Sequence, residues 1–298
     1  MQQNNKTAIE QRLVGYVDQL ESHPIGALCS LNMVPRNVLA LFAEAQLGDS
    51  NTWLGMLATA KGIITEPKLL EAVKANIACE AGLNGVPHPT LCAKFAAGLG
   101  VTQFRSNPKY FALQDYTIEA SASAVVMTEN KLAGWLLAQE SLVPILFRVF
   151  RSAFAKIKGI DLTYLDEHIR VDTEEHARWM LDGVLALLEK SKAYYGAKLE
   201  PDHDARYGGW GTTILGEVLY GIDLAGRVTL SVPDILYGMT LRHYRGTAPW
   251  NGCPDVINRR FLVNSFATPL RETSRRARGG GALGCSTSGT QGYHGAKL

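Results

Sequence analysis

Apolar residues recur three or four positions apart along most of the chain, which is the spacing of one face of an α-helix. Near the N-terminus, Ile9, Leu13, Val17 and Leu20 follow this spacing. Further segments with the same period lie at about 38–45, 52–64, 66–82, 90–99, 108–128, 131–158, 162–195, 211–222 and 233–243. Alternation typical of a β-strand is nearly confined to Val228–Val232. The pattern therefore predicts an all-α fold, a compact helical bundle.

Turn-forming residues separate the predicted helices. Gly, Asp, Ser and Asn at positions 48–51 predict one turn, and residues 82–89 predict another. Pro144 is expected to break the helix over 131–158, because a proline inside a helix cannot donate a backbone hydrogen bond.

The composition changes after about residue 250. Residues 271–298 contain Arg275, Arg276 and Arg278, then three glycines and mostly Ser, Thr and Gly. Such a segment buries too little apolar surface to offset the entropy lost on ordering. We expect one domain over residues 1–250 and a C-terminal extension over 251–298, largely disordered after about residue 271.

The overall composition is that of a globular protein, with 19% charged and 46% hydrophobic residues. A net charge of +2 gives no electrostatic reason to bind nucleic acid or an anionic membrane. The N-terminal residues lack the apolar core of a signal peptide, and no stretch approaches about 18 uninterrupted apolar residues. Five scattered cysteines without a CxxC pair suit a reducing compartment. We therefore expect a cytoplasmic protein with no nucleic-acid or membrane partner.

His168, Asp172 and His176 lie four residues apart, so on an α-helix they fan over only about 80°. Two imidazoles and a carboxylate on one stripe are what iron, manganese or zinc would take from a single segment. Paired His and Asp at this spacing also occur as surface hydrogen-bond pairs, so the stripe alone leaves both interpretations open.

Two other segments offer further ligands. Glu80 precedes a Gly/Asn turn, and His88 precedes a proline, so Glu80 is expected to end one helix where His88 begins the next. Glu140 lies in an apolar helix, where an unpaired carboxylate is costly, and it therefore needs a partner. Nitrogen and oxygen donors without a thiolate suit iron or manganese better than structural zinc.

The order of these residues resembles that of the haem-oxygenase-like diiron oxidases. The segments 88–100 and 135–144 are similar to the helices that carry the first histidine and the glutamate of that family, and the resemblance spans roughly residues 20–200. It implies a haem-oxygenase-like helical bundle, two Fe ions, with Mn as an alternative, and O₂ as co-substrate. The metal ligands that it implies are Glu80, His88, Glu140, His168, Asp172 and His176.

One departure from the family pattern concerns the last ligand. The final histidine of the family usually follows the aspartate by three residues, whereas here Glu175 holds that place and His176 comes one residue later. A π-bulge could restore His176, the wider fan could be accommodated, or Glu175 could itself be a ligand.

Glu44, an acid in another apolar helix, is a weaker candidate, because some N-oxygenating members carry an extra carboxylate from a preceding helix. An exposed or otherwise paired side chain is the alternative for Glu44.

The resemblance implies an O₂-dependent oxidoreductase of specialised-metabolite biosynthesis. N-oxygenation of a small amine or amino-acid-derived metabolite is favoured, and oxidative C–C cleavage or decarboxylation of an amino acid or medium-chain fatty acid is the alternative. A metal-free protein of the same fold and a helical partner protein are alternatives of other classes. Cys29, Cys79 and Cys92 lie in no recognisable nucleophile context, which argues against a thiaminase-like enzyme. The expected partners are a small-molecule substrate, an external electron donor and a second copy in a homodimer.

Overall fold

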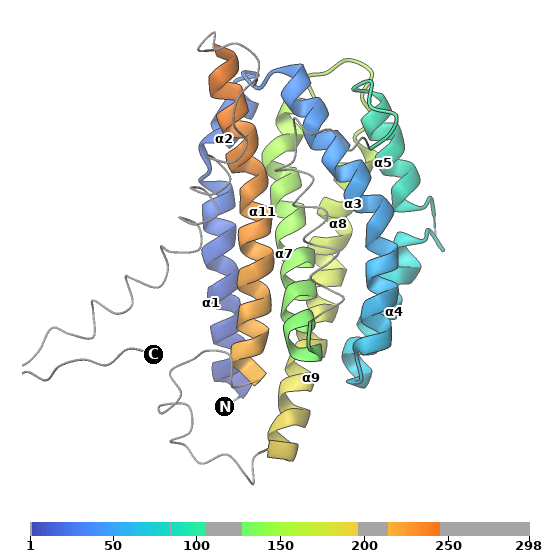
Figure 1. Cartoon of the computed structure of the whole chain (residues 1–298), viewed down its shortest axis with the longest axis vertical. Helices are drawn as coiled ribbons and strands as arrows, with labels where there is room; N and C mark the ends of the chain where they lie inside the picture. Colours follow the sequence, from blue (N-terminus) through green and yellow to red (C-terminus); the bar gives the residue numbers. More distant parts are fainter. Residues whose placement is uncertain (1, 84, 105–126, 196–213, 245–298) are drawn as a thin grey trace, which may run out of the picture. The chain divides into compact units, whose positions relative to one another are not determined.

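The computed structural model describes residues 2–83, 85–104, 127–195 and 214–244, and every regular element in these ranges is a helix (Figure 1). The elements are α1 (Gln2–Glu21), α2 (Pro24–Ser30), α3 (Arg36–Ile63), α4 (Pro67–Glu80), α5 (His88–Ala97), α7 (Glu129–Phe154), α8 (Thr163–Val171), the π-helix η2 (Asp172–His176), α9 (Ala177–Tyr195) and α11 (Ile214–Tyr244). The predicted all-α bundle is confirmed. Positions 108–126 of one predicted helix and the extension over 251–298 lie outside the described residues.

The central helix of the described bundle is α7. It packs against α1, α2, α8, α9 and α11, and Figure 1 shows it between α11 and α8. Trp135, Phe147, Phe150 and Phe154 on this helix are completely buried, so burial of their apolar surface is a main stabilising contribution. By length and composition α7 is apolar enough to cross a membrane, but 78% of its most apolar window is buried inside the protein.

The predicted break at Pro144 is wrong, because α7 continues through this residue to Phe154. A proline removes the hydrogen bond to the carbonyl four residues earlier, which here belongs to Glu140. Pro144 is buried among the neighbouring helices, and this packing offsets the lost bond. The backbone carbonyl without this hydrogen bond therefore belongs to the residue whose carboxylate the sequence singled out.

The turn predicted at residues 48–51 is also wrong, because these residues lie inside α3. The alternating run Val228–Val232 lies inside α11, in agreement with the all-α prediction. A Cβ at Gly48 would come within 2.7 Å of the Phe104 ring, so this glycine serves a close side-chain contact. Thr229 is fully buried and donates its hydroxyl hydrogen to the Ala225 carbonyl at 2.9 Å, as helical threonines do.

Candidate metal centre

The structure brings the six predicted ligands together inside the bundle as two groups of three. The first group is Glu80, His88 and His168, and the second is Glu140, Asp172 and His176. Within each group the potential ligand atoms all lie within 4.8 Å of one another, and every member is buried. Ionisable groups without compensation are costly in such surroundings, so their convergence indicates a binding site.

The end of α4 and the start of α5 position the first group. Gly82 has a φ of +72°, and the Leu83 amide donates to the Ala78 carbonyl at 3.0 Å, which ends α4 in a left-handed cap. The chain then reverses, so His88 opens α5 beside Glu80, the last residue of α4. His88 Nδ1 lies 3.0 Å from Glu80 Oε2. As predicted, Glu80 ends one helix and His88 begins the next one beside it.

His168 is oriented by the backbone of its own helix. Its Nδ1 donates to the Tyr164 carbonyl at 2.9 Å, which leaves Nε2 as the nitrogen with a free lone pair. Nε2 is directed towards Glu80 and lies 3.8 Å from Oε1. Burial lowers the pKa of His168, so the imidazole is neutral and able to coordinate a cation.

The π-helix η2 positions the second group. Its wider turn absorbs the extra residue between Asp172 and His176, and His176 is completely buried. His176 Nδ1 lies 2.9 Å from Asp172 Oδ1 and 3.2 Å from Glu140 Oε2. The side chain of Glu175 is 43% exposed and lies 4.0 Å from Arg170. Of the two alternatives for the last ligand, the structure brings His176 into the group and turns Glu175 outward.

Glu44, the weaker candidate on α3, belongs to neither group. It is half-buried, and it is absent from the lining of the pocket onto which the two groups open. The carboxylate that α3 contributes to this pocket is that of Asp49.

Several buried atoms of the two groups lack a conventional hydrogen bond. His88 Nδ1, Asp172 Oδ1 and His176 Nε2 form none with the described residues, although the first two lie about 3 Å from a possible partner. Close approach without hydrogen-bond geometry is expected where lone pairs converge on a shared cation. Burial and the charge of Glu140 raise the pKa of Asp172 well above its ordinary value, a repulsion that a cation would relieve. The donor set therefore fits iron or manganese.

Sequence reasoning missed two neighbours of these groups. Asn76, completely buried on α4, donates through Nδ2 to Glu140 Oε1 at 2.5 Å. It lies one turn before Glu80 on the same helix, and this spacing was the available signal. The neighbouring imidazoles of His176 and His88 lower the pKa of Cys79 to about 7, so this thiol does lie beside ionisable partners.

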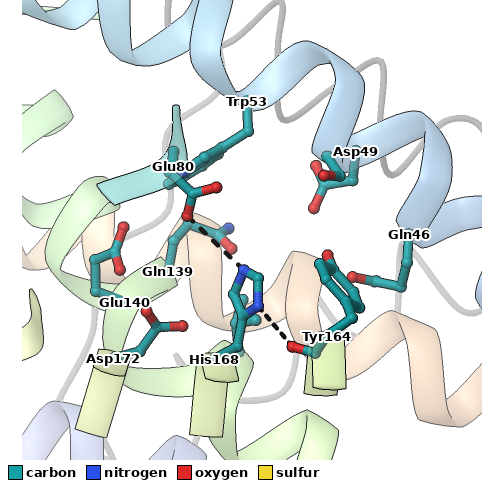
Figure 2. Close-up of a pocket in the computed structure, with 11 residues that line it drawn as sticks. Gln46, Asp49, Trp53, Glu80, Gln139, Glu140, Tyr164, His168 and Asp172 are labelled. Atoms are coloured by element: carbon teal, nitrogen blue, oxygen red, sulfur yellow. Dashed lines mark hydrogen bonds and ion pairs between the residues drawn. The ribbon is translucent and has the colours of Figure 1, made fainter. Parts of the chain in front are cut away.

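Both groups open onto one pocket with a cavity volume of about 40 Å³. Glu80 and His168 reach it from the first group, and Glu140 and Asp172 from the second. Figure 2 shows Asp49 on the opposite side of the pocket from these last two residues.

Sequence reasoning missed Asp49 because it assigned residues 48–51 to a turn. The signal was the helical spacing of Gln46, Asp49, Ser50 and Trp53, which all line the pocket.

Comparisons with known proteins agree with this fold. Two crystal structures of a CADD-like protein of unknown function from Nostoc punctiforme superpose with TM-scores of 0.54. The first is 14% identical and covers 78% of this chain and 99% of the other, and the second is 13% identical and covers 80% and 97%. At this identity the similarity concerns the fold alone. No significant match to a curated protein is found.

The sequence profile of a protein family identifies the class. Residues 45–198, which carry all six predicted ligands, match the family described as iron-containing redox enzymes. This match confirms the resemblance inferred from the motifs at the level of the family. The chain belongs to the family of iron-containing redox enzymes.

Proposed function

We propose that this protein is an O₂-activating non-haem diiron oxidase that acts on a small amine or amino-acid-derived metabolite. The observation that carries the proposal is the pair of buried donor groups that open onto one pocket, in a chain of an iron-containing redox family. Each group supplies only nitrogen and oxygen donors. Such donors suit iron, whereas structural zinc sites are usually rich in thiolates.

In this proposal each donor group holds one metal ion. Glu80, His88 and His168 hold the first, and the second is held by Glu140, Asp172 and His176. When bound, iron would supply the electrons for the reduction of O₂. Three carboxylates offset most of the charge of two divalent cations and leave a single positive charge, which keeps the buried centre close to neutral.

The neighbouring residues hold the ligands in place. The Tyr164 carbonyl fixes the tautomer of His168, and Asn76 holds one oxygen of Glu140 so that the other faces His176. Trp53, Val143 and Tyr164 form apolar parts of the pocket wall and limit the access of water to the reacting groups.

The polar part of the pocket supports the proposed substrate class. Gln46, Asp49, Ser50 and Gln139 line it, and these polar side chains suit a small polar molecule better than a fatty-acid chain. N-oxygenation of an amine is therefore favoured within the proposal. A cytoplasmic location, an external electron donor and a homodimer remain predictions.

Anaerobic titration with Fe(II) tests the metal content. We expect about two irons per chain, and a transient visible absorption band after mixing with O₂. His168→Ala and Glu140→Ala should each bind less iron, because each removes a donor from one group. Glu71→Ala is the matched control on α4, since the Glu71 side chain is 71% exposed. Equal iron binding by the parent and both site variants would refute the assignment.

Asn76→Leu is expected to weaken iron binding by about 10–100-fold while the six donors stay in place. The change removes the hydrogen bond to Glu140 and leaves this carboxylate free to rotate. Iron affinity is measured by competition with a chromogenic chelator, and circular dichroism of the metal-free protein checks the fold. The control is Asn51→Leu, at an exposed position of α3. An unchanged affinity would show that Asn76 does not position Glu140.

A further inference from the structure

Asp49 is the carboxylate of the pocket that belongs to neither donor group. Within the ranges that the structure describes, no residue forms a hydrogen bond or an ion pair with its side chain. Each of the other carboxylates has a neighbour, because Glu80 lies beside His88, Glu140 accepts from Asn76, and Asp172 lies beside His176. The Asp49 carboxylate is therefore available to a molecule that enters the pocket.

We infer that Asp49 binds the cationic nitrogen of the substrate, an ammonium or guanidinium group, and thereby selects amines for the metal centre. This inference rests on the proposed function and names the residue that determines its substrate class. Figure 2 shows Asp49 and Gln46 across the pocket from Glu140 and Asp172, so a bound amine would lie between Asp49 and the donor groups.

The charges of the pocket make a cation the fitting partner for Asp49. No lysine or arginine is among the described residues that line this pocket. A carboxylate removed from bulk water is costly without a partner, and a bound cation supplies one. The single positive charge left on a loaded diferrous centre is cancelled by Asp49, so a monocationic substrate meets no net repulsion.

The residues beside Asp49 supply further acceptors. Ser50 Oγ is buried and makes no hydrogen bond with the described residues, and the side chain of Gln46 lines the same wall. A primary ammonium has several N–H donors and a guanidinium has more, so one carboxylate does not satisfy them all. Asp49, Ser50 and Gln46 together present carboxylate, hydroxyl and amide oxygens at helical spacing on one face of α3.

The same wall disfavours an anionic substrate. The carboxylate of a fatty acid on this side of the pocket would approach Asp49 with no lysine or arginine in the described lining to neutralise it. Like charges in a partly dehydrated pocket repel strongly. Asp49 therefore favours amines both by attraction and by exclusion of acids.

The test compares Asp49→Asn with the parent in binding of n-butylammonium, guanidinium and butyrate. Calorimetric titration of the Fe(II)-loaded protein without O₂ measures binding alone. We expect the parent to prefer the cations to butyrate, and Asp49→Asn to bind the cations about 10–100-fold more weakly, since a charge-assisted hydrogen bond is lost. Asp182→Asn, at an exposed position of α9, is the matched control and should bind like the parent.

The iron content of the same samples distinguishes a failure of this inference from a failure of the proposed function. Retained iron with weakened cation binding in Asp49→Asn is the expected result. Loss of iron in this variant would make Asp49 a metal ligand and overturn the inference, as would equal cation binding by both proteins or a parent that prefers butyrate. A parent without iron refutes the proposed function, and cation binding to the metal-free parent and variant then still decides the role of Asp49.

Discussion

His176→Ala is expected to lower the iron content from about two to about one per chain, whereas Glu175→Ala leaves it unchanged. His176 is completely buried and lies 2.9 Å from Asp172 and 3.2 Å from Glu140, so its loss leaves two carboxylates of the second group without their imidazole. Glu175 lies one residue earlier in the same π-helix, and its side chain is 43% exposed. The two variants therefore form a matched pair of adjacent positions.

The measurement is iron per chain after anaerobic loading and desalting, with turnover of an amine panel as a second readout. Loss of a ligand is expected to abolish detectable O₂-dependent turnover, because both ions are needed in the proposed chemistry. Thermal melting of the metal-free proteins shows whether His176→Ala is folded. Iron loss in Glu175→Ala with retention in His176→Ala would reverse the assignment of the last ligand.

The ligand-type residues could be predicted from the sequence because their chemistry conflicts with their surroundings. Glu140 stands in an otherwise apolar helix, and the stripe from His168 to His176 has a spacing that a helix converts into one face. The helical period alone predicts the bundle, since each helix must bury its apolar face. The extra residue before His176 was visible as a departure, and a π-helix was one of the ways to accommodate it.

The wrong predictions concern positions where a distant contact overrides a local preference. Residues 48–51 have the composition of a turn, but at Gly48 the ring of Phe104 occupies the space where a Cβ would be. This error concealed Asp49, one residue further along α3. Pro144 is a helix breaker in isolation, yet the packing of α7 on several neighbours keeps it helical. Asn76 could be found only from its spacing of one turn before Glu80, because its partner Glu140 lies on another helix.

Gly221→Ala is expected to destabilise the bundle by about 3 kcal/mol, because two helices touch at this position. A Cβ on Gly221 would lie 2.0 Å from the Lys131 carbonyl oxygen, and one on Gly134 would lie 1.9 Å from that of Val218. These contacts are with backbone atoms of α7 and α11, which cannot rotate away as a side chain can. The two helices would have to separate, and the apolar contacts along their whole interface would loosen.

The measurement is the thermal midpoint of the parent, Gly221→Ala and Gly134→Ala, followed by circular dichroism. The expected decrease is roughly 6–12 °C for a domain of this size. Gly55→Ala is the matched control, because a Cβ there meets nothing within 4 Å, and alanine in an exposed helix should stabilise by up to about 1 kcal/mol. Since α7 also carries Glu140, iron affinity should fall together with the midpoint in Gly134→Ala. Unchanged midpoints in both variants would show that α7 and α11 are not in backbone contact.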